Sequence, residues 1–310
     1  MEEYHEVFPF GPGYSYYQKN HQLNDVLKIA KFTPDLICFG AGWEWEGIWG
    51  DNEIDFDPQP SISLSNSNIP SVMILNKEYK KLDKKFDFIK KNKISMVFTA
   101  HHNYRKWEKK INVRFNYFPF AIDNKNFNDH RMSKIYDFGF SGSLHKKWTD
   151  IRGRVKSKLF YFPKLIKSID QNSNKLIKRS LLRDKNIFWN EEPFNNYYGK
   201  KYSMLLNSSK IWLCTTSAID LVGTRFYEIM ASKSLLFCNR SEAYNSLFID
   251  GEHCIMFEND LTDFEEKLSF YIHHAKEREV IVNNAYEHVM KNHTWSNRID
   301  LFTKAISKIL

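Results

Sequence analysis

Short apolar runs alternate with amphipathic segments along the chain. Uninterrupted apolar runs predict strands at residues 35–39, 71–75, 95–99, 137–141, 211–214 and 234–238. Because these runs lack polar and apolar alternation, they are typical of parallel strands that are covered on both faces. Hydrophobic residues recur at helical spacing in residues 23–31, 78–91, 200–208 and 224–231. This βαβ order predicts a doubly wound α/β architecture.

The pattern is interrupted near residues 119–135, where a strand-like segment ends at Pro119 and a polar stretch follows it. We therefore expect two Rossmann-like domains that face a cleft, an N-terminal domain over residues 1–130 and a C-terminal domain over 131–310. The last fifty residues read as helices, and Thr262 and Glu265 have the spacing of a capping box. The last helix is expected to pack back on the N-terminal domain.

Composition narrows the class of protein. Hydrophobic residues make up 42% of the 310 residues and charged residues 26%, which is typical of a globular chain and excludes a disordered one. No apolar run reaches the roughly 18 residues of a membrane span, and the acidic N-terminus does not resemble a signal peptide. The four cysteines, Cys38, Cys214, Cys238 and Cys254, lie in apolar contexts and predict buried free thiols in a reducing, cytoplasmic setting.

The positive charge is concentrated in one segment. Lys77–Lys110 contains 12 Lys or Arg residues against four acids, so this segment alone accounts for the net charge of +8. Such a block attracts an anionic partner, for example a nucleic acid or an anionic membrane surface. The alternative is an ordinary solvated helix face, because the lysines are interspersed with Tyr79, Leu82, Phe86 and Ile89 at helical spacing.

The segment around residue 225 carries the clearest candidate chemistry. Gly223 permits a tight turn and Thr224 can cap a helix, whose N-terminus would offer N–H groups to an anion. The guanidinium of Arg225 has the fork geometry that suits phosphate. Glu228 lies one turn further along, where its carboxylate can accept hydrogen bonds from ribose hydroxyls. The alternative is an i,i+3 surface ion pair between Arg225 and Glu228.

Ordered landmarks over residues 136–305 resemble the donor-site signature of GT-B glycosyltransferases, particularly the CgeB-like or glycosyl transferases group 1 family. They are Arg225–Ala231, the following strand, Leu247–Cys254, Glu277–Glu279 and His293–Arg298. The resemblance implies a GT-B glycosyltransferase, hexosyl or related, that moves a sugar from a nucleotide-diphosphate sugar to a glycan, protein or small molecule. It also implies retention of the anomeric configuration and no metal, with the nucleotide sugar as co-substrate in place of a cofactor.

The same resemblance assigns roles to individual residues. Asp220 and Glu228 keep the Glu-x7-Glu spacing of larger retaining relatives, which implies that Asp220 faces the transferred sugar and Glu228 the ribose. Together with Arg225, which would stabilise the leaving diphosphate, they form the expected catalytic set. Gly142 and Ser143 end a strand that resembles the family's phosphate-side element, with Lys147 and Arg152 following. A plain β-turn with surface cations is the alternative there.

Two further groups of residues are weaker candidates. Trp189 occupies the place where relatives contact the base. On the acceptor side, Trp43 and Glu44 follow a predicted strand and either bind a sugar or close the core. His101 and His102 follow another strand and either line the cleft or form a surface pair.

The N-terminal half departs from the family pattern. His5–Tyr14 resembles a segment that follows an earlier strand and helix in relatives, so we expect a shortened acceptor domain. Asp55 and Asp57 form a DxD motif, which binds a metal-bound diphosphate in the other glycosyltransferase architecture; no metal is expected here. Two other functions stay open: a glycosyltransferase that acts on modified DNA bases, for which the basic block would contact nucleic acid, and a non-catalytic GT-B-like binding protein.

Overall fold

The structure is a computed structural model of the 310-residue chain. It describes residues 5–11, 14–18, 21–40, 64, 66–76, 78–79, 81–144, 150–160, 165–169, 176–180, 185–191 and 198–310. The chain divides into two compact units, which we call unit 1 (Met1–Pro119 with Arg298–Leu310) and unit 2 (Phe120–Asn297). The sequence analysis placed the division at residue 130, within the polar stretch that follows Pro119.

Unit 1 is built on a four-stranded parallel sheet of order β1-β2-β3-β4. Its strands are β1 (Ile37–Phe39), β2 (Ser71–Ile74), β3 (Met96–Thr99) and β4 (Arg114–Tyr117). Its helices are α1 (Leu23–Ala30), α2 (Leu82–Lys91), α3 (Arg105–Ile111) and most of α9 (Trp295–Ile306).

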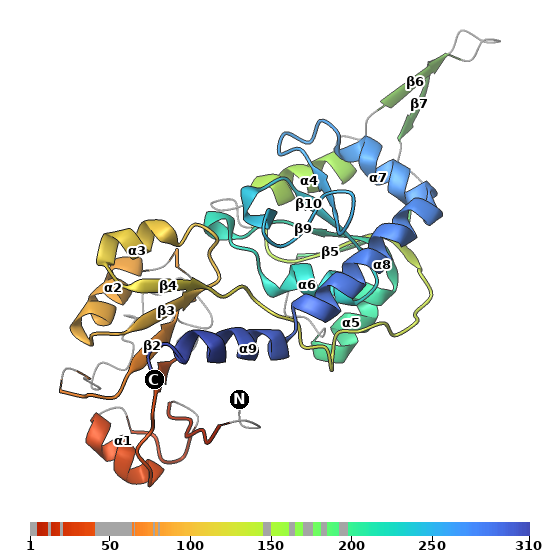
Figure 1. The fold of residues 1–310 in the computed structure, drawn as a ribbon. Coiled ribbons are helices and arrows are strands. Elements are labelled where there is room, and N and C mark those ends of the chain that lie inside the picture. The colour runs from red at the N-terminus through yellow and green to blue at the C-terminus, as the bar shows by residue number, and fades with distance from the viewer. Residues whose placement is uncertain are drawn as a thin grey trace. The chain divides into compact units, whose positions relative to one another are not determined.

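Both faces of the unit 1 sheet are covered, as Figure 1 shows. On one face, residues such as Val97 pack with Phe86 of α2 and Trp107 of α3. On the other face, Phe98 packs with Phe302 of α9. Because successive strand residues point to opposite faces, a strand covered on both sides must be apolar at every position. This is the physical reason for the uninterrupted apolar runs in the sequence.

Unit 2 is built on a five-stranded parallel sheet of order β11-β10-β9-β5-β8. Its strands are β5 (Tyr136–Ser141), β8 (Ile187–Asn190), β9 (Ser209–Cys214), β10 (Leu235–Asn239) and β11 (Ile255–Phe257). Its helices are α4 (Asp150–Phe160), α5 (Gly199–Asn207), α6 (Thr224–Ala231), α7 (Phe264–His273) and α8 (Ala275–Asn292). An antiparallel pair, β6 (Leu165–Ile169) with β7 (Leu176–Ser180), forms a separate small sheet.

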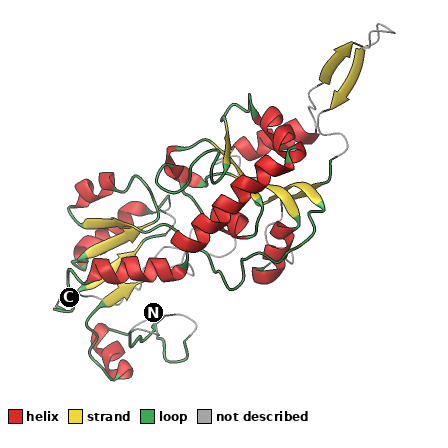
Figure 2. Ribbon diagram, turned by 45° about the vertical axis from the view of Figure 1, so that its right-hand side comes forward, coloured by secondary structure: helices red, strands yellow, loops and turns green. Residues whose placement is uncertain are grey.

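The two central strands of unit 2 approach closely at Gly139. A Cβ atom at this position would lie 2.2 Å from the ring of Trp212 on β9, so only glycine fits without displacing the ring. Trp212 is fully buried and in turn packs edge-on against Tyr202 of α5. Gly139 thus allows β5, β9 and α5 to pack as one body. Figure 2 shows the sheets enclosed by helices in both units.

The predicted α/β class with parallel sheets is confirmed, and each predicted strand and helix has a counterpart within a few residues. The sequence analysis did not predict α3, α4, the β6–β7 pair, β8 or β11. The capping box at Thr262 was wrong, because α7 begins at Phe264 and Asp263 bonds instead to Glu258 and Lys267. Cys38 is free but exposed, unlike the other three thiols. No described helix combines the length and the hydropathy that crossing a membrane requires.

Candidate functional site

Unit 2 gathers charged side chains at the carboxyl ends of its central strands. The loop after β5 contains Gly142 and Ser143, and the loop after β9 leads to the N-terminus of α6. Ligands of open α/β sheets bind at this edge. We call the group formed by Ser141, Arg152, Tyr202, Arg225 and Glu228 the α6 site.

Arg225 joins α6 to the end of β5. Its Nη1 atom donates to the carbonyl oxygen and to Oγ of Ser141, both at 3.0 Å. Its Nε atom donates to Oε2 of Glu228 at 3.2 Å. The side chains of Arg225 and Glu228 are 31% and 16% exposed, so both are partly buried and still reach the surface. The pair therefore differs from a solvated ion pair on a helix face, because its cation is tied to a second element.

Tyr202 of α5 holds the guanidinium from the other side. The Arg225 Cζ atom lies 4.3 Å from the centre of the Tyr202 ring, within the range of a cation–π contact. The Tyr202 hydroxyl lies 3.3 Å from Ser141 Oγ, which also accepts from Arg225. Tyr202 is buried. Three elements, α5, α6 and β5, thus fix the position of one cationic group.

Glu228 occupies a low-dielectric position at the same place. Burial raises the pKa of Glu228 above its usual value, and the neighbouring Arg225 and Thr224 offset only part of this effect. Thr224, at the first position of α6, lies near this carboxylate and favours its charged form. A partly desolvated carboxylate is a stronger hydrogen-bond acceptor for a ligand hydroxyl than one in bulk water.

Arg152 supplies a second guanidinium to the loop after β5. Its Nη1 donates to the carbonyl oxygen of Ser143 at 3.0 Å, and its Nε donates to Thr215 Oγ1 at 2.8 Å. Burial lowers the pKa of Arg152, and the nearby charge of Arg225 lowers it further. A guanidinium nevertheless stays protonated in proteins. Two cations that repel each other therefore flank residues 141–143, an arrangement that a bound anion stabilises.

The N-terminus of α6 differs from the sequence expectation in its cap. Gly223, not Thr224, is the N-cap residue, and no side chain bonds to the first turn. Gly223 has a φ of −84° and open space around its Cβ position, so no tight turn requires glycine there. The helix end lies beside Arg225 and adds its positive dipole to the two guanidinium groups.

Asp220 lies in the loop before α6 and is exposed. Its Oδ1 accepts from the hydroxyl of Thr216 at 3.2 Å. Asp220 and Ile219 have φ values of 58° and 56°, in the left-handed region that a β-branched residue rarely adopts. Such strained backbone is concentrated at functional loops.

The remaining unit 2 candidates lie at the same edge of the sheet. Gly142 has a φ of 153°, and a Cβ there would lie 3.7 Å from Arg152 Nη1. Trp189 of β8 packs against Phe140, with ring centres 4.3 Å apart, and its indole N–H donates to Glu191 at 2.8 Å. Its ring thus covers the end of β5 at this edge of the sheet. Lys147 lies outside the described residues.

The unit 1 candidates are separate from the α6 site in the chain and in chemistry. His101 is buried and packs against His102 and Trp107, so the surface-pair alternative fails for His101. Trp43, Glu44 and the Asp55–Asp57 motif lie outside the described residues. Within the described ranges, no cluster of three or more His, Cys, Asp or Glu side chains is arranged to hold a metal ion.

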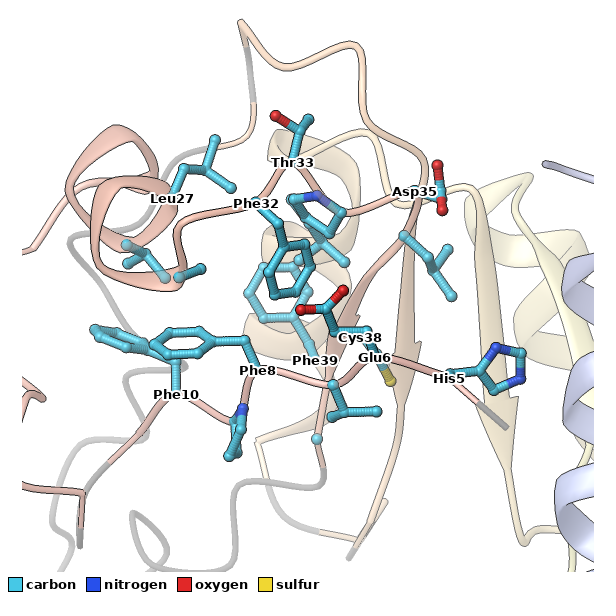
Figure 3. A pocket seen from close by; sticks show the side chains of 18 of the residues that line it. His5, Glu6, Phe8, Phe10, Leu27, Phe32, Thr33, Asp35, Cys38 and Phe39 are labelled. Atoms are coloured by element: carbon cyan, nitrogen blue, oxygen red, sulfur yellow. The ribbon is translucent and has the colours of Figure 1, made fainter. Parts of the chain in front are cut away.

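Unit 1 also contains a cavity of about 740 Å³ between α1, β1 and the end of α9. Figure 3 shows aromatic rings such as Phe8, Phe10 and Phe32 on its walls, with the carboxylate of Glu6 among them. Its described lining includes two carboxylates and no Lys or Arg. The cavity is therefore unsuited to a diphosphate group.

The sequence analysis missed residues that hold the α6 site together. No motif in the sequence included Tyr202, Thr215 or Asn239. Asn239, buried at the end of β10, accepts from the backbone N–H of Thr216 and from the hydroxyl of Tyr244. The only available signal was position, since Thr215 and Asn239 adjoin the carboxyl ends of predicted strands.

Part of the chain matches a known protein family. Residues 173–304 match the family model described as glycosyl transferase-like, a range that includes α6 and its preceding loop. The comparison with curated proteins gave no significant match. The CgeB-like group stays a prediction.

Solved structures share the fold at low sequence identity. HepE from Anabaena, solved with UDP and glucose, is 10% identical with a TM-score of 0.53, over 77% of this chain and 72% of that chain. Sucrose-phosphate synthase from Thermosynechococcus elongatus is 9% identical with a TM-score of 0.54, over 91% and 75%. The pneumococcal O-GlcNAc transferase GtfA, solved with UDP and GlcNAc, is 12% identical with a TM-score of 0.53, over 95% and 61%. The solved structures show that the chain has the GT-B fold, and residues 173–304 are similar to the glycosyl transferase-like family.

Proposed function

We propose that the α6 site binds the nucleoside diphosphate part of a nucleotide-sugar donor. The observation that carries this proposal is the Arg225–Glu228 pair, whose cation is bonded to the end of β5 while a second guanidinium, Arg152, flanks the same loop. A diphosphate would lie between the two guanidiniums and the N-terminus of α6. The ribose would lie against Glu228, whose carboxylate accepts from its hydroxyls.

The same cations would act on the reaction itself. Negative charge develops on the diphosphate as the bond to the sugar breaks, and preorganised cations stabilise that charge most in the transition state. Arg225 is preorganised by Ser141 and Tyr202 before any ligand arrives. We propose that these groups assist departure of the diphosphate without a divalent metal.

The proposed donor nucleotide and the proposed retention of configuration have separate support. UDP is present in the HepE and GtfA structures, which makes UDP-sugars the first donors to test. Retention of configuration is supported by the Asp220–Glu228 spacing and by the strained loop that holds Asp220 at the sheet edge. The acceptor, a glycan, protein or small molecule, would be bound by other parts of the protein.

A binding experiment tests the donor proposal. The full chain is titrated by calorimetry with UDP, UDP-glucose, UDP-GlcNAc and GDP, with and without EDTA, beside the variant Arg225→Ala. We expect at least one ligand to bind, EDTA to leave its affinity unchanged, and the variant to lose it. The absence of binding by every ligand, or equal affinity in the variant, would contradict the proposal.

The stereochemical proposal needs its own measurement. Proton NMR of the first product released from the preferred donor, by transfer or by slow hydrolysis, reports the anomeric configuration. We expect the configuration of the donor to be kept. An inverted product would refute the role given to Asp220 while leaving the donor site intact.

A further inference from the structure

Unit 1 carries a basic surface that the glycosyltransferase chemistry does not use. Residues 81–114 place nine Lys and Arg side chains in exposed positions, against two exposed carboxylates, Asp83 and Asp87. We call these nine residues the basic face: Lys84, Lys90, Lys91, Lys93, Arg105, Lys106, Lys109, Lys110 and Arg114.

The basic face is continuous because α2 and α3 lie side by side on one face of the sheet (Figure 1). Lys110 of α3 bonds to Asp83 of α2 at 2.8 Å, and its ammonium lies 5.5 Å from the ring of Phe86. Beneath this pair, Phe86 and Trp107 pack with the sheet. The two helices are thus held in one layer, and their outward sides form one surface.

Several cations of the basic face have no carboxylate partner within the part of the chain that the structure describes. Among the described residues, no carboxylate forms an ion pair with Lys90, Lys91 or Lys93, or with Lys106 or Lys109. Asp83 forms an ion pair with Lys110 at 2.8 Å. Like charges so close together repel one another, and an external anionic surface would relieve that repulsion.

The composition of the basic face distinguishes between anionic partners. Seven of the nine cations are Lys, a compact point charge, and not Arg, which reads planar phosphate and base edges. The aromatic side chains of this region, such as Trp107, are buried or half-buried, so no exposed ring is available to stack on a base. No large apolar side chain of residues 81–114 is exposed, so contact would stay at the level of charged groups.

We propose that the basic face docks unit 1 reversibly on a membrane surface that contains anionic phospholipids. Two helices in one layer, the longer about 15 Å in length, present a broad area that fits a plane of headgroups. Clusters of this number of Lys and Arg bind anionic lipid through charge alone. This inference is independent of the donor site proposed above.

Vesicle sedimentation of the full chain tests the proposal. The two lipid samples are phosphatidylcholine alone and phosphatidylcholine mixed with an equal share of phosphatidylglycerol. We expect the protein to sediment with the anionic vesicles only, and raised salt to release it. The partition of the variant Lys91→Gln/Lys106→Gln/Lys109→Gln onto the anionic vesicles should be weaker by about tenfold or more.

A matched variant removes the same charge elsewhere. Lys276, Lys291 and Lys304 are exposed on α8 and α9, so Lys276→Gln/Lys291→Gln/Lys304→Gln should keep most of the binding. Circular dichroism verifies that both triple variants are folded. Failure to bind anionic vesicles, equal loss in the two triple variants, or tighter binding to duplex DNA than to the vesicles would each overturn the proposal.

Discussion

The carboxyl edges of the two parallel sheets differ in the charge that they bury. In unit 2, two guanidinium groups, Arg152 and Arg225, reach the loop after β5 and remain partly accessible. In unit 1, the corresponding edge buries one charge of each sign. The carboxylate of Glu78 is 2% exposed and accepts a hydrogen bond from Thr99, and the ammonium of Lys85, also 2% exposed, donates to the carbonyl oxygen of Asn76 at 2.6 Å. Two like charges at one loop attract a diphosphate, whereas opposite buried charges largely offset each other. Among the described residues, only the unit 2 edge directs two guanidinium groups at one loop, and this is the basis of the donor-site proposal.

Loss of Arg225 should have the largest effect on nucleotide binding at the α6 site. Arg225→Ala removes the group tied to β5 and leaves Glu228 as an unpaired, partly buried carboxylate. We expect nucleotide affinity to fall about 100-fold, which corresponds to about 3 kcal/mol for charge-assisted hydrogen bonds. Calorimetric titration with UDP measures this loss. The control Arg154→Ala, on an exposed arginine of the same helix as Arg152, should bind normally.

The close approach of β5 and β9 should be the next most sensitive feature. Gly139→Ala places a methyl group 2.2 Å from the Trp212 ring, which must move toward Tyr202. We expect a loss of about 2–3 kcal/mol in the free energy of unfolding, as for other overpacked cores. Gly153→Ala, in the open surroundings of α4, should be neutral or stabilising by about 0.5–1 kcal/mol. Equal effects in urea denaturation would show that the strands are not packed as described.

The role of Tyr202 divides into its ring and its hydroxyl. Tyr202→Phe keeps the ring under Arg225 and loses the hydroxyl near Ser141, so we expect a two- to threefold loss of UDP affinity, within the ~0.5–1 kcal/mol of a neutral hydrogen bond. Tyr202→Leu also loses the cation–π contact and should weaken binding about tenfold. If both variants bind equally, the ring does not position the guanidinium.

Glu228 should give opposite pH dependences for stability and for ligand binding. Its pKa is raised in the folded protein, so folding favours the protonated form, and stability should fall as pH rises from the ordinary carboxyl pKa to the raised one. Nucleotide affinity should rise over the same interval, because the ionised carboxylate is the better acceptor. Glu228→Gln should remove the contribution of this carboxyl group to both pH dependences. The control Glu78→Gln, on the buried carboxylate of unit 1, should leave the pH dependence of affinity unchanged.

The sequence predicted most of the sheet because each central strand is covered on both faces and therefore reads as an apolar run. It predicted Arg225 and Glu228 as partners because they lie one helical turn apart. It could not predict that Arg225 bonds to Ser141, which lies 84 residues away. Tyr202 likewise meets Arg225 only through the packing of α5 against α6. Contacts of this kind depend on strand order and register, for which single residues carry no local signal.

Local rules also failed at the N-termini of two helices. Thr262 has the spacing of an N-cap residue, yet its hydroxyl bonds to Asp260, and α7 begins two residues later. At Gly223 the residue type suggested a tight turn, but the backbone there is extended and serves as the N-cap of α6. In both places the helix was predicted, but the residue that caps its N-terminus was not.

The proposed contact between Glu228 and the ribose hydroxyls can be tested directly with two ligands and two proteins. UDP and its 2′,3′-dideoxy analogue are titrated by calorimetry into the wild-type protein and into Glu228→Gln. The account predicts that loss of the ribose hydroxyls weakens binding to the wild type about tenfold and has little further effect in the variant, because the two changes remove one interaction. Equal weakening in both proteins would show that Glu228 does not contact the ribose and would contradict the account.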